Sequence, residues 1–354
     1  MNFLMFFAGL VFLVGGAELL VRGASKLAFS FGISPLVVGL TIVAFGTSAP
    51  EMAVSVNAVL GGQSDIAIGN VVGSNIFNVL FILGLAALIT PLVVNIQLIR
   101  QEVPIMLGAS LLLLIFALDG RIGMLDGAVL FGLVLAYTVF LIVQSRNETQ
   151  AARDEYAGEF KPAEKGGWDE RMPIQLSLIL IGLSVLVLGA HWLVTSAVIF
   201  AKAMGVSDVV IALTIVAAGT SLPEVATSII AAIKGERDIA VGNVVGSCTF
   251  NLLGVVGLAG LVIPGSVMQF DIWVVLAVAL ACLPVFITGR EIARWEGGVF
   301  LGCYVAYVTY LVLQAQQSAA LGGFIWAMTS VVLPLTVIAL VVAMVQSSAA
   351  NPPK

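Results

Sequence analysis

The stretch "GTSAPE", Gly46–Glu51, places a carboxylate beside a proline inside a segment that otherwise has the composition of a membrane helix. A charged side chain at that depth costs about 2.5–3.5 kcal/mol on insertion scales. A proline removes a hydrogen bond from the helix backbone. The same combination returns as "GTSLPE", Gly219–Glu224. Because the chain accepts both costs twice, we interpret the two stretches as functional rather than structural.

The composition of the whole chain is that of a membrane protein. Its 354 residues are 60% hydrophobic and only 10% charged, whereas soluble domains are about half apolar and about a quarter charged. We therefore expect an all-α polytopic membrane protein, not an enzyme and not a nucleic-acid-binding protein. Apolar stretches of about 20 residues predict eleven spans, near residues 2–21, 33–60, 66–89, 103–118, 122–143, 173–194, 206–233, 239–262, 272–288, 294–315 and 324–346.

The chain contains two copies of one pattern, related by a shift of 173 residues. Leu40–Ser55 overlies Leu213–Ser228 with 12 of 16 positions identical, and Asp65–Asn78 overlies Asp238–Asn251 with 11 of 14 identical. Each copy holds five predicted spans, an odd number, so the second copy must enter the membrane from the opposite side. Inverted repeats of this kind are typical of secondary transporters.

This repeat predicts four parts of the chain. The single long polar segment is expected to be a solvated linker between the copies. The last predicted span has no counterpart in either copy, so we expect it to be an extra helix that faces lipid or another subunit. The parts are a first repeat at 1–143, a linker at 144–172, a second repeat at 173–315, and an extra C-terminal span with its tail at 316–354.

Basic residues predict the orientation. With the N-terminus outside and the linker in the cytoplasm, only Arg121 and Lys202 fall on the outer side. Thirteen fall on the inner side, which is a strong positive-inside bias. They are Arg22, Lys26, Arg100, Arg146, Arg153, Lys161, Lys165, Arg171, Lys234, Arg237, Arg290, Arg294 and Lys354.

The first repeated block has the residues of a cation site. Gly46 and Pro50 can interrupt the helix and free backbone oxygens from Ala44 to Thr47, and free carbonyls at membrane depth need protein, water or a cation. Hydroxyl and carboxylate oxygens follow on nearby turns. The candidate ligands are Ala44, Thr47, Ser48 and Glu51, repeated as Ala217, Thr220, Ser221 and Glu224.

The second block offers a matching polar face. Asn70, Ser74 and Asn78 are spaced four residues apart, so they share one side of a helix; the repeat supplies Asn243, Ser247 and Asn251. The combined set is rich in hard oxygens and has neither thiolate nor imidazole. It suits Ca²⁺, Mg²⁺, Mn²⁺ or Na⁺ rather than zinc or copper. Glu18 lies outside it, with Arg22 one turn away, and is expected to form a structural ion pair or to occupy an interfacial position.

The paired blocks resemble the two alpha-repeats of the cation/calcium exchanger superfamily, nearest to its prokaryotic sodium/calcium exchanger branch. The likeness covers residues 1–315, with "GTSxPE" followed by "GNVVGS" twice. It implies ten membrane helices in two inverted halves around four ion subsites. By resemblance Glu51 and Glu224 bind both ions, with main-chain oxygens of Thr47 and Thr220. The flanking Na⁺ sites would correspond to Ala44, Ser48, Ser74, Ala217, Ser221 and Ser247, and the centre to Asn78 and Asn251.

The resemblance implies an antiporter in the inner membrane of a prokaryote. Its substrates would be Ca²⁺ and Na⁺, with no cofactor and no obligatory protein partner. Some relatives carry an aspartate at a central position, notably the potassium-dependent exchangers, whereas both positions are asparagine here. Three alternatives stay open: an H⁺/Ca²⁺ exchanger of the same fold, a potassium-dependent exchanger, and a passive cation channel.

Overall fold

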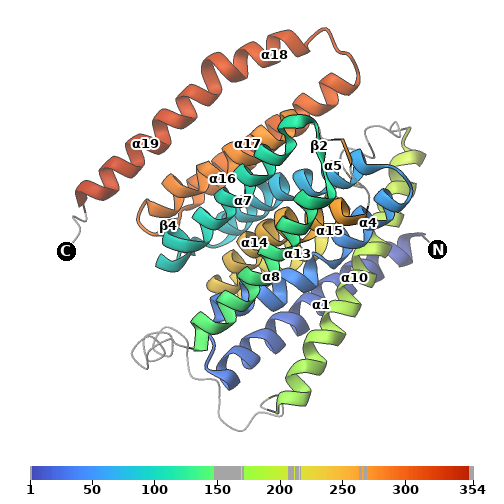
Figure 1. Cartoon of the computed structure of the whole chain (residues 1–354), viewed down its shortest axis with the longest axis vertical. Coiled ribbons are helices and arrows are strands. Elements are labelled where there is room, and N and C mark those ends of the chain that lie inside the picture. Colours follow the sequence, from blue (N-terminus) through green and yellow to red (C-terminus); the bar gives the residue numbers. More distant parts are fainter. Residues whose placement is uncertain are drawn as a thin grey trace.

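Long apolar helices make up most of the chain, as the composition predicts (Figure 1). The computed structural model describes residues 2–146, 169, 171–205, 211, 215, 217–262, 265–266 and 269–350. The predicted linker at 144–172 therefore lies almost wholly outside the described residues. Nine residues of the predicted span 206–233 lie outside them too.

The elements of the first half follow the predicted spans closely. The helix α1 continues ten residues beyond the predicted end at residue 21. In chain order the elements are α1 (Asn2–Phe31), α2 (Pro35–Val38), the π-helix η1 (Gly39–Val43), α3 (Ala44–Thr47), α4 (Ala49–Leu60), α5 (Ser64–Ile76), the π-helix η2 (Phe77–Leu83), α6 (Gly84–Ile89), β1 (Leu92–Val93), the π-helix η3 (Leu98–Glu102), α7 (Val103–Phe116), the 3₁₀ turn η4 (Ala117–Asp119), β2 (Arg121–Ile122) and α8 (Met124–Arg146).

The second half repeats much of this order. Its elements are α10 (Met172–Ala203), α12 (Ala217–Gly219), α13 (Leu222–Ile233), α14 (Arg237–Phe250), the π-helix η7 (Asn251–Val255), α15 (Val256–Val262), β3 (Gly265–Ser266), α16 (Gln269–Ile287), β4 (Glu291–Ile292) and α17 (Arg294–Ala315). A C-terminal arm follows, made of α18 (Leu321–Ala327), the π-helix η8 (Met328–Val332) and α19 (Leu333–Ala350).

Among the described residues, eight helices are long and apolar enough to cross a membrane, and nine if the bent pair Pro35–Thr47 and Ala49–Leu60 is one span. Two further predicted spans correspond to the shorter apolar helices Leu222–Ile233 and Ile272–Ile287. The sequence count of eleven spans stays a prediction.

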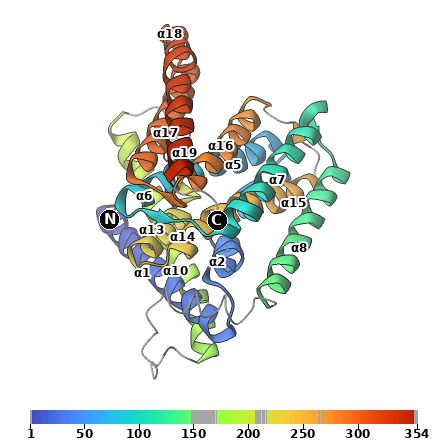
Figure 2. The same ribbon diagram turned by 90° about the vertical axis from the view of Figure 1, so that its left-hand side faces the viewer.

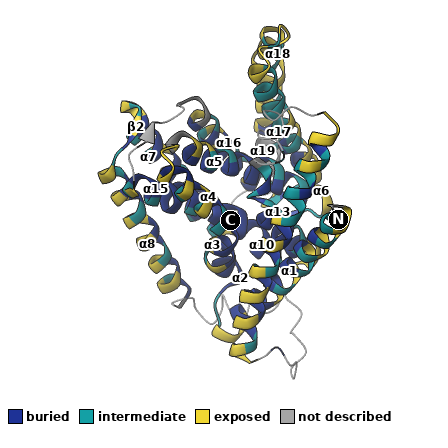
Figure 3. Cartoon of the chain, turned by 90° about the vertical axis from the view of Figure 1, so that its right-hand side faces the viewer, coloured by how far each residue is buried: buried dark blue, intermediate teal, exposed yellow. Residues whose placement is uncertain are grey.

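The most buried helices lie in the middle of the bundle. In an 18-residue apolar stretch of each span, 83% of the residues are buried in Arg237–Val262 and 72% in Ile66–Ile89, against 6% in Arg294–Ala315. Figure 3 shows the same gradient, with buried residues inside and exposed residues on the outer helices. The two central spans carry the second repeated block, and five of its polar residues lie in the protein interior: Ser74, Asn78, Asn243, Ser247 and Asn251.

The helices α1 and α10 pack against each other along their length (Figures 1 and 2). Gly9 faces Gly189, and Gly16 faces Gly182, so the two helices run antiparallel. A side chain at Gly16 would meet the backbone nitrogen of Leu186 at 2.5 Å. Glycine therefore permits this close contact, as small residues do between membrane helices.

Two short ladders join the halves. The strand β1 pairs antiparallel with β4, and β2 pairs antiparallel with β3. Each strand has only two residues. The purely helical prediction missed these ladders, because two residues at the end of a helix carry no readable pattern of alternation.

The C-terminal arm α18–α19 stands away from most of the bundle (Figure 2). Its apolar side chains are largely exposed, including Trp326, Leu335 and Val337. It touches α16 and α17. A lipid-facing or subunit-facing role remains a prediction.

Candidate functional site

Each repeated "GTSxPE" stretch breaks its helix at the serine. The helix α3 ends at Thr47, Ser48 has φ −81° and ψ 4°, and α4 begins at Ala49 with a bend of 44°. In the second half, Ser221 has φ −89° and ψ 6° before α13. A proline sits in the first turn of each new helix, where its missing N–H is not needed. The break that the sequence predicts is therefore present in both halves.

The two glutamates begin these new helices. Glu51 and Glu224 each lie in the first turn and are completely buried. The N-terminus of a helix carries partial positive charge, which stabilises a carboxylate there. The fold therefore offsets part of the cost of burying two acidic groups.

Each glutamate accepts a hydrogen bond from the serine of the other half. Ser48 Oγ donates to Glu224 Oε1 at 3.0 Å, and Ser221 Oγ donates to Glu51 Oε1 at 2.8 Å. Adding 173 to the number of Ser48 and subtracting 173 from that of Glu224 gives Ser221 and Glu51, so the two bonds are equivalent in the repeat. The two broken helices therefore meet at their breaks and form one site rather than two.

Threonines and asparagines form a second crossed pair around the first. Thr47 Oγ1 donates to Asn243 Oδ1 at 3.1 Å, and Thr220 Oγ1 donates to Asn70 Oδ1 at 3.4 Å. The Asn70 amide also donates to the main-chain oxygen of Glu51 at 3.2 Å. These bonds fix the helix break relative to the face of α5.

Several buried polar atoms have no hydrogen-bond partner. They include the second carboxylate oxygen of each glutamate, both amide atoms of Asn78 and the Oδ1 atom of Asn251. Buried polar atoms are normally satisfied, so these atoms are available to bind an ion or water. Among the predicted ligands, these atoms are Glu51 Oε2, Glu224 Oε2, Ser74 Oγ, Asn78 Nδ2 and Oδ1, and Asn251 Oδ1.

The asparagines of this set lie at π-helical segments. Asn78 belongs to η2, and Asn251 begins η7. Wide turns of this kind occur frequently at functional sites. The segment η2 packs on α13, which carries Glu224, and η7 packs on α4, which carries Glu51. Each central asparagine is therefore brought against the glutamate helix of the other half.

The other predicted ligands lie in the same region. Thr47, Ser48, Ser74, Ser221 and Ser247 are buried, and Thr220 is half-buried. Ala217 begins α12, and its side chain lies outside the described residues.

One detail of the sequence argument does not hold. The carbonyl of Ala44 was expected to lose its partner, but it accepts hydrogen bonds from Ser48 N at 3.0 Å and from the hydroxyls of Thr47 and Ser247 at 3.4 Å each. The Ala44 oxygen keeps its partners because α3 completes its last turn before the helix breaks at Ser48. A role for it as an ion ligand stays a prediction.

Sequence reasoning missed three contributors. Ser55 and Ser228 accept from the amides of Asn70 and Asn243 at 3.1 and 2.9 Å. They lie at equivalent, identical positions of the repeat, which is the signal that could have identified them. Asn75 is the third, and its equivalent residue is a cysteine, so the repeat gave no signal for it.

The described residues contain no cluster of three or more His, Cys, Asp or Glu side chains that could hold a metal. The site combines two carboxylates with amide and hydroxyl oxygens. This is a donor set for a hard cation such as Ca²⁺ or Na⁺ and does not suit zinc or copper. Two negative charges match one divalent cation.

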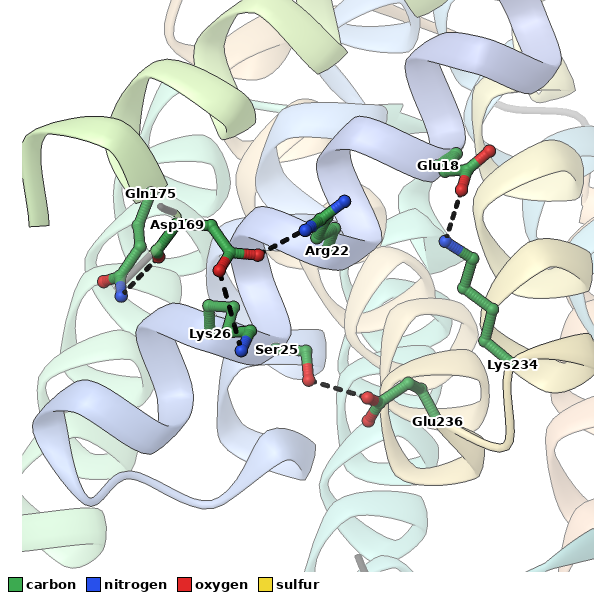
Figure 4. Close-up of polar contacts among 8 residues, drawn as sticks. All are labelled: Glu18, Arg22, Ser25, Lys26, Asp169, Gln175, Lys234 and Glu236. Atoms are coloured by element: carbon green, nitrogen blue, oxygen red, sulfur yellow. Dashed lines mark hydrogen bonds and ion pairs between the residues drawn. The ribbon is translucent and has the colours of Figure 1, made fainter. Parts of the chain in front are cut away.

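Charged residues in the second half of α1 form a separate set of polar contacts (Figure 4). Glu18 pairs with Lys234 at 2.9 Å, not with Arg22 as the spacing predicted. Arg22 instead pairs with Asp169 at 2.7 Å, and Ser25 donates to Glu236 at 2.7 Å. Glu18 is therefore in a structural ion pair, as expected, but with a residue from the other half.

The contact of Asp169 with α1 is expected to depend on pH. The hydrogen bond from Arg22 lowers the pKa of Asp169 below its ordinary value, and the charge of Lys26 adds to the shift. A lowered pKa means that the contact stabilises the fold above about pH 4, the ordinary range of aspartate, and is lost as pH falls through the lowered pKa. Hydrogen exchange of the segment around Asp169 should be faster in Arg22→Gln than in the wild type at pH 7. The difference should shrink as pH falls through the lowered pKa of Asp169; a difference independent of pH would contradict this.

Comparison with known proteins gives consistent matches. The model of the family described as "Sodium/calcium exchanger protein" matches residues 1–143 and 174–313. The chain is similar to the sodium/calcium exchanger MaX1 of Methanosarcina acetivorans, with 35% identity over 88% of this chain and 98% of that protein. It is 39% identical to the inner membrane protein YrbG of Escherichia coli (strain K12), over 73% of this chain and 79% of that protein.

A solved structure is similar as well. The sodium–calcium exchanger NCX_Mj, soaked with 10 mM Na⁺ and 10 mM Sr²⁺, superposes with a TM-score of 0.76 at 30% identity. The match covers 87% of this chain and 97% of that chain.

Proposed function

Because the chain belongs to the sodium/calcium exchanger family, a family of transporters rather than enzymes, we propose that it exchanges Ca²⁺ for Na⁺ across the membrane by alternating access. The observation that carries this proposal is the crossed pair of serine–glutamate hydrogen bonds. It joins both halves at one buried centre and leaves Glu51 Oε2 and Glu224 Oε2 without a protein partner.

The two ions would compete for this centre. Two ionised carboxylates neutralise one Ca²⁺, while Na⁺ ions would share the carboxylates and recruit hydroxyl and carbonyl oxygens at the flanks. We assign the centre to Glu51, Glu224, Asn78 and Asn251. We assign the flanks to Ala44, Thr47, Ser48, Ser74, Ala217, Thr220, Ser221 and Ser247. A site that must be loaded before it changes face exchanges one ion for the other.

We further propose ten membrane helices in two inverted halves, followed by an eleventh. The antiparallel packing of α1 on α10 supports the inversion. The N-terminus would lie outside, with residues 144–172 in the cytoplasm and the protein in the inner membrane of a prokaryote. The helices α1 and α10 would slide across the centre when the site changes face.

Three related activities compete with this proposal. An H⁺/Ca²⁺ exchanger would load protons on Glu51 or Glu224 in place of Na⁺. A potassium-dependent exchanger would need K⁺ in addition, but both central positions are asparagine. A channel would pass Ca²⁺ without a counter-ion, which inverted repeats with broken helices do not favour.

Proteoliposomes loaded with Na⁺, K⁺ or H⁺ in separate preparations distinguish these activities. We expect Ca²⁺ uptake only when Na⁺ is inside and its gradient points outward. If three Na⁺ leave for each Ca²⁺ that enters, one positive charge leaves per cycle, and an inside-positive potential of 100 mV would assist uptake by about 2.3 kcal/mol. Uptake driven by H⁺, a need for K⁺, or uptake without any counter-gradient would each replace the proposal with the corresponding alternative.

A further inference from the structure

Two positions that are equivalent in the repeat touch each other where the halves meet. Asn75 in α5 and Cys248 in α14 are 173 residues apart and both are buried. The Asn75 Nδ2 atom donates to the main-chain oxygen of Cys248 at 3.1 Å, and Cys248 Sγ lies 3.9 Å from the main-chain oxygen of Asn75. Each residue therefore contacts the main-chain oxygen of the other, Asn75 with its amide and Cys248 with its thiol.

The contact of Asn75 with Cys248 determines which way a neighbouring amide points. A main-chain oxygen can only accept, so the Asn75 NH₂ group must face Cys248, and the Asn75 Oδ1 atom remains to accept another bond. Asn251 Nδ2 donates to this Oδ1 at 3.3 Å. The Asn251 amide is therefore oriented with its nitrogen toward Asn75 and its Oδ1 away from it. That Oδ1 is buried and has no protein partner.

In the other half, no second amide among the described residues orients Asn78 in the way that Asn75 orients Asn251. Beside Asn78 lies the Cys248 thiol, a weak hydrogen-bonding group that gives the amide at most a weak contact. Neither amide atom of Asn78 has a hydrogen-bond partner of normal geometry in the described part of the chain. The two central asparagines, identical in sequence, are thus held differently.

We propose that Asn75 is a positioning residue for ion binding: its amide fixes Asn251 with the carbonyl oxygen presented to the cation, whereas no such amide orients Asn78. This inference rests on the proposed function, because it assigns Asn251 to the ion site. A carbonyl oxygen that is oriented in advance is a better Ca²⁺ ligand than one that must rotate on binding. Asn75 acts through Asn251 and touches no ion itself.

Equilibrium Ca²⁺ binding to the purified full-length chain in Na⁺-free detergent solution tests this. Titration calorimetry with Ca²⁺ alone does not depend on the identity of the counter-ion. We expect Asn75→Ala to weaken Ca²⁺ binding roughly three- to tenfold, the scale of one hydrogen bond between neutral groups. We expect Asn251→Ala to weaken it at least as much, because it removes the ligand itself.

A double-mutant cycle on Ca²⁺ affinity distinguishes a positioning role of Asn75 from a general packing role. In an Asn251→Ala background, Asn75→Ala should have no further effect on Ca²⁺ affinity. In an Asn78→Ala background it should keep its full effect. Equal effects in both backgrounds would overturn the proposal. If the wild type itself binds no Ca²⁺, the proposed function fails and this inference with it, and that result is visible before any variant is made.

A second test exchanges the two side chains across the interface, so that the same amide and thiol are present in opposite halves. The double variant Asn75→Cys with Cys248→Asn moves the orienting amide to the other half. Ca²⁺ affinity should then depend more strongly on Asn78 and less on Asn251 when each is changed to alanine. If the dependence stays on Asn251, Asn75 does not orient it.

Discussion

Replacing Glu51 or Glu224 with glutamine is expected to abolish Ca²⁺ exchange while leaving a folded protein. Glutamine keeps the shape of the side chain, and its carbonyl oxygen can still accept the crossed serine bond. It removes one of the two negative charges that face the ion. Removing one partner of a buried charge pair costs about 3–5 kcal/mol, so Ca²⁺ affinity should fall by roughly 100-fold or more. Ca²⁺ flux in proteoliposomes and Ca²⁺ titration of the purified chain measure the two effects.

Glu18→Gln is the matched control for this experiment. It makes the same chemical change on a half-exposed ion pair with Lys234, and such surface pairs contribute about 0–1 kcal/mol. Ca²⁺ affinity and ion selectivity should stay unchanged. Exchange that survives in both Glu51→Gln and Glu224→Gln would remove these residues from the ion site. An altered selectivity in Glu18→Gln would move the site toward α1.

The sequence was sufficient to locate the elements that build the site. Apolar length predicted most spans to within a few residues, and glycine, proline and carboxylate together predicted the two helix breaks. The ends of α1 and α10 were predicted ten and nine residues too early, because apolar length reports where a helix leaves the membrane, not where it ends. The residues after Val21 include Arg22 and Lys26, which favour helix although they end the apolar run.

The contacts within the site could not be predicted in the same way. The repeat identifies Ser48 with Ser221 and Glu51 with Glu224, but it does not say whether a serine bonds the glutamate of its own half or of the other. That choice depends on how the broken helices meet in space. Asn75 was missed for a related reason: its equivalent is Cys248, so the property that matters is the difference between the halves, and similarity cannot reveal it.

The second substitution with a large expected effect is Gly246→Ala in α14, where this helix packs closely on the first half. A Cβ atom there would lie 2.6 Å from the main-chain oxygen of Leu40, 2.7 Å from Leu40 Cα and 2.9 Å from Ala44 Cβ. These are mostly backbone atoms, which cannot rotate away as a flexible side chain would. Gly246→Ala therefore has to push α14 away from η1 and α3.

That displacement would be felt at the ion site, because the next residue, Ser247, donates to Ala44, and Asn243 one turn earlier accepts from Thr47. We expect Gly246→Ala to lower stability by about 1–3 kcal/mol, the usual cost of overpacking, and to reduce Ca²⁺ flux severely even where the protein remains folded. Gly302→Ala in α17 is the control, since Gly302 is exposed and no described atom lies within 4 Å of the added methyl group. Thermal unfolding in detergent and flux in proteoliposomes measure the two effects. Gly246→Ala could instead transport Ca²⁺ as well as Gly302→Ala does. In that case α14 can shift relative to α3 without cost, and the hydroxyl and amide ligands do not depend on this close helix contact.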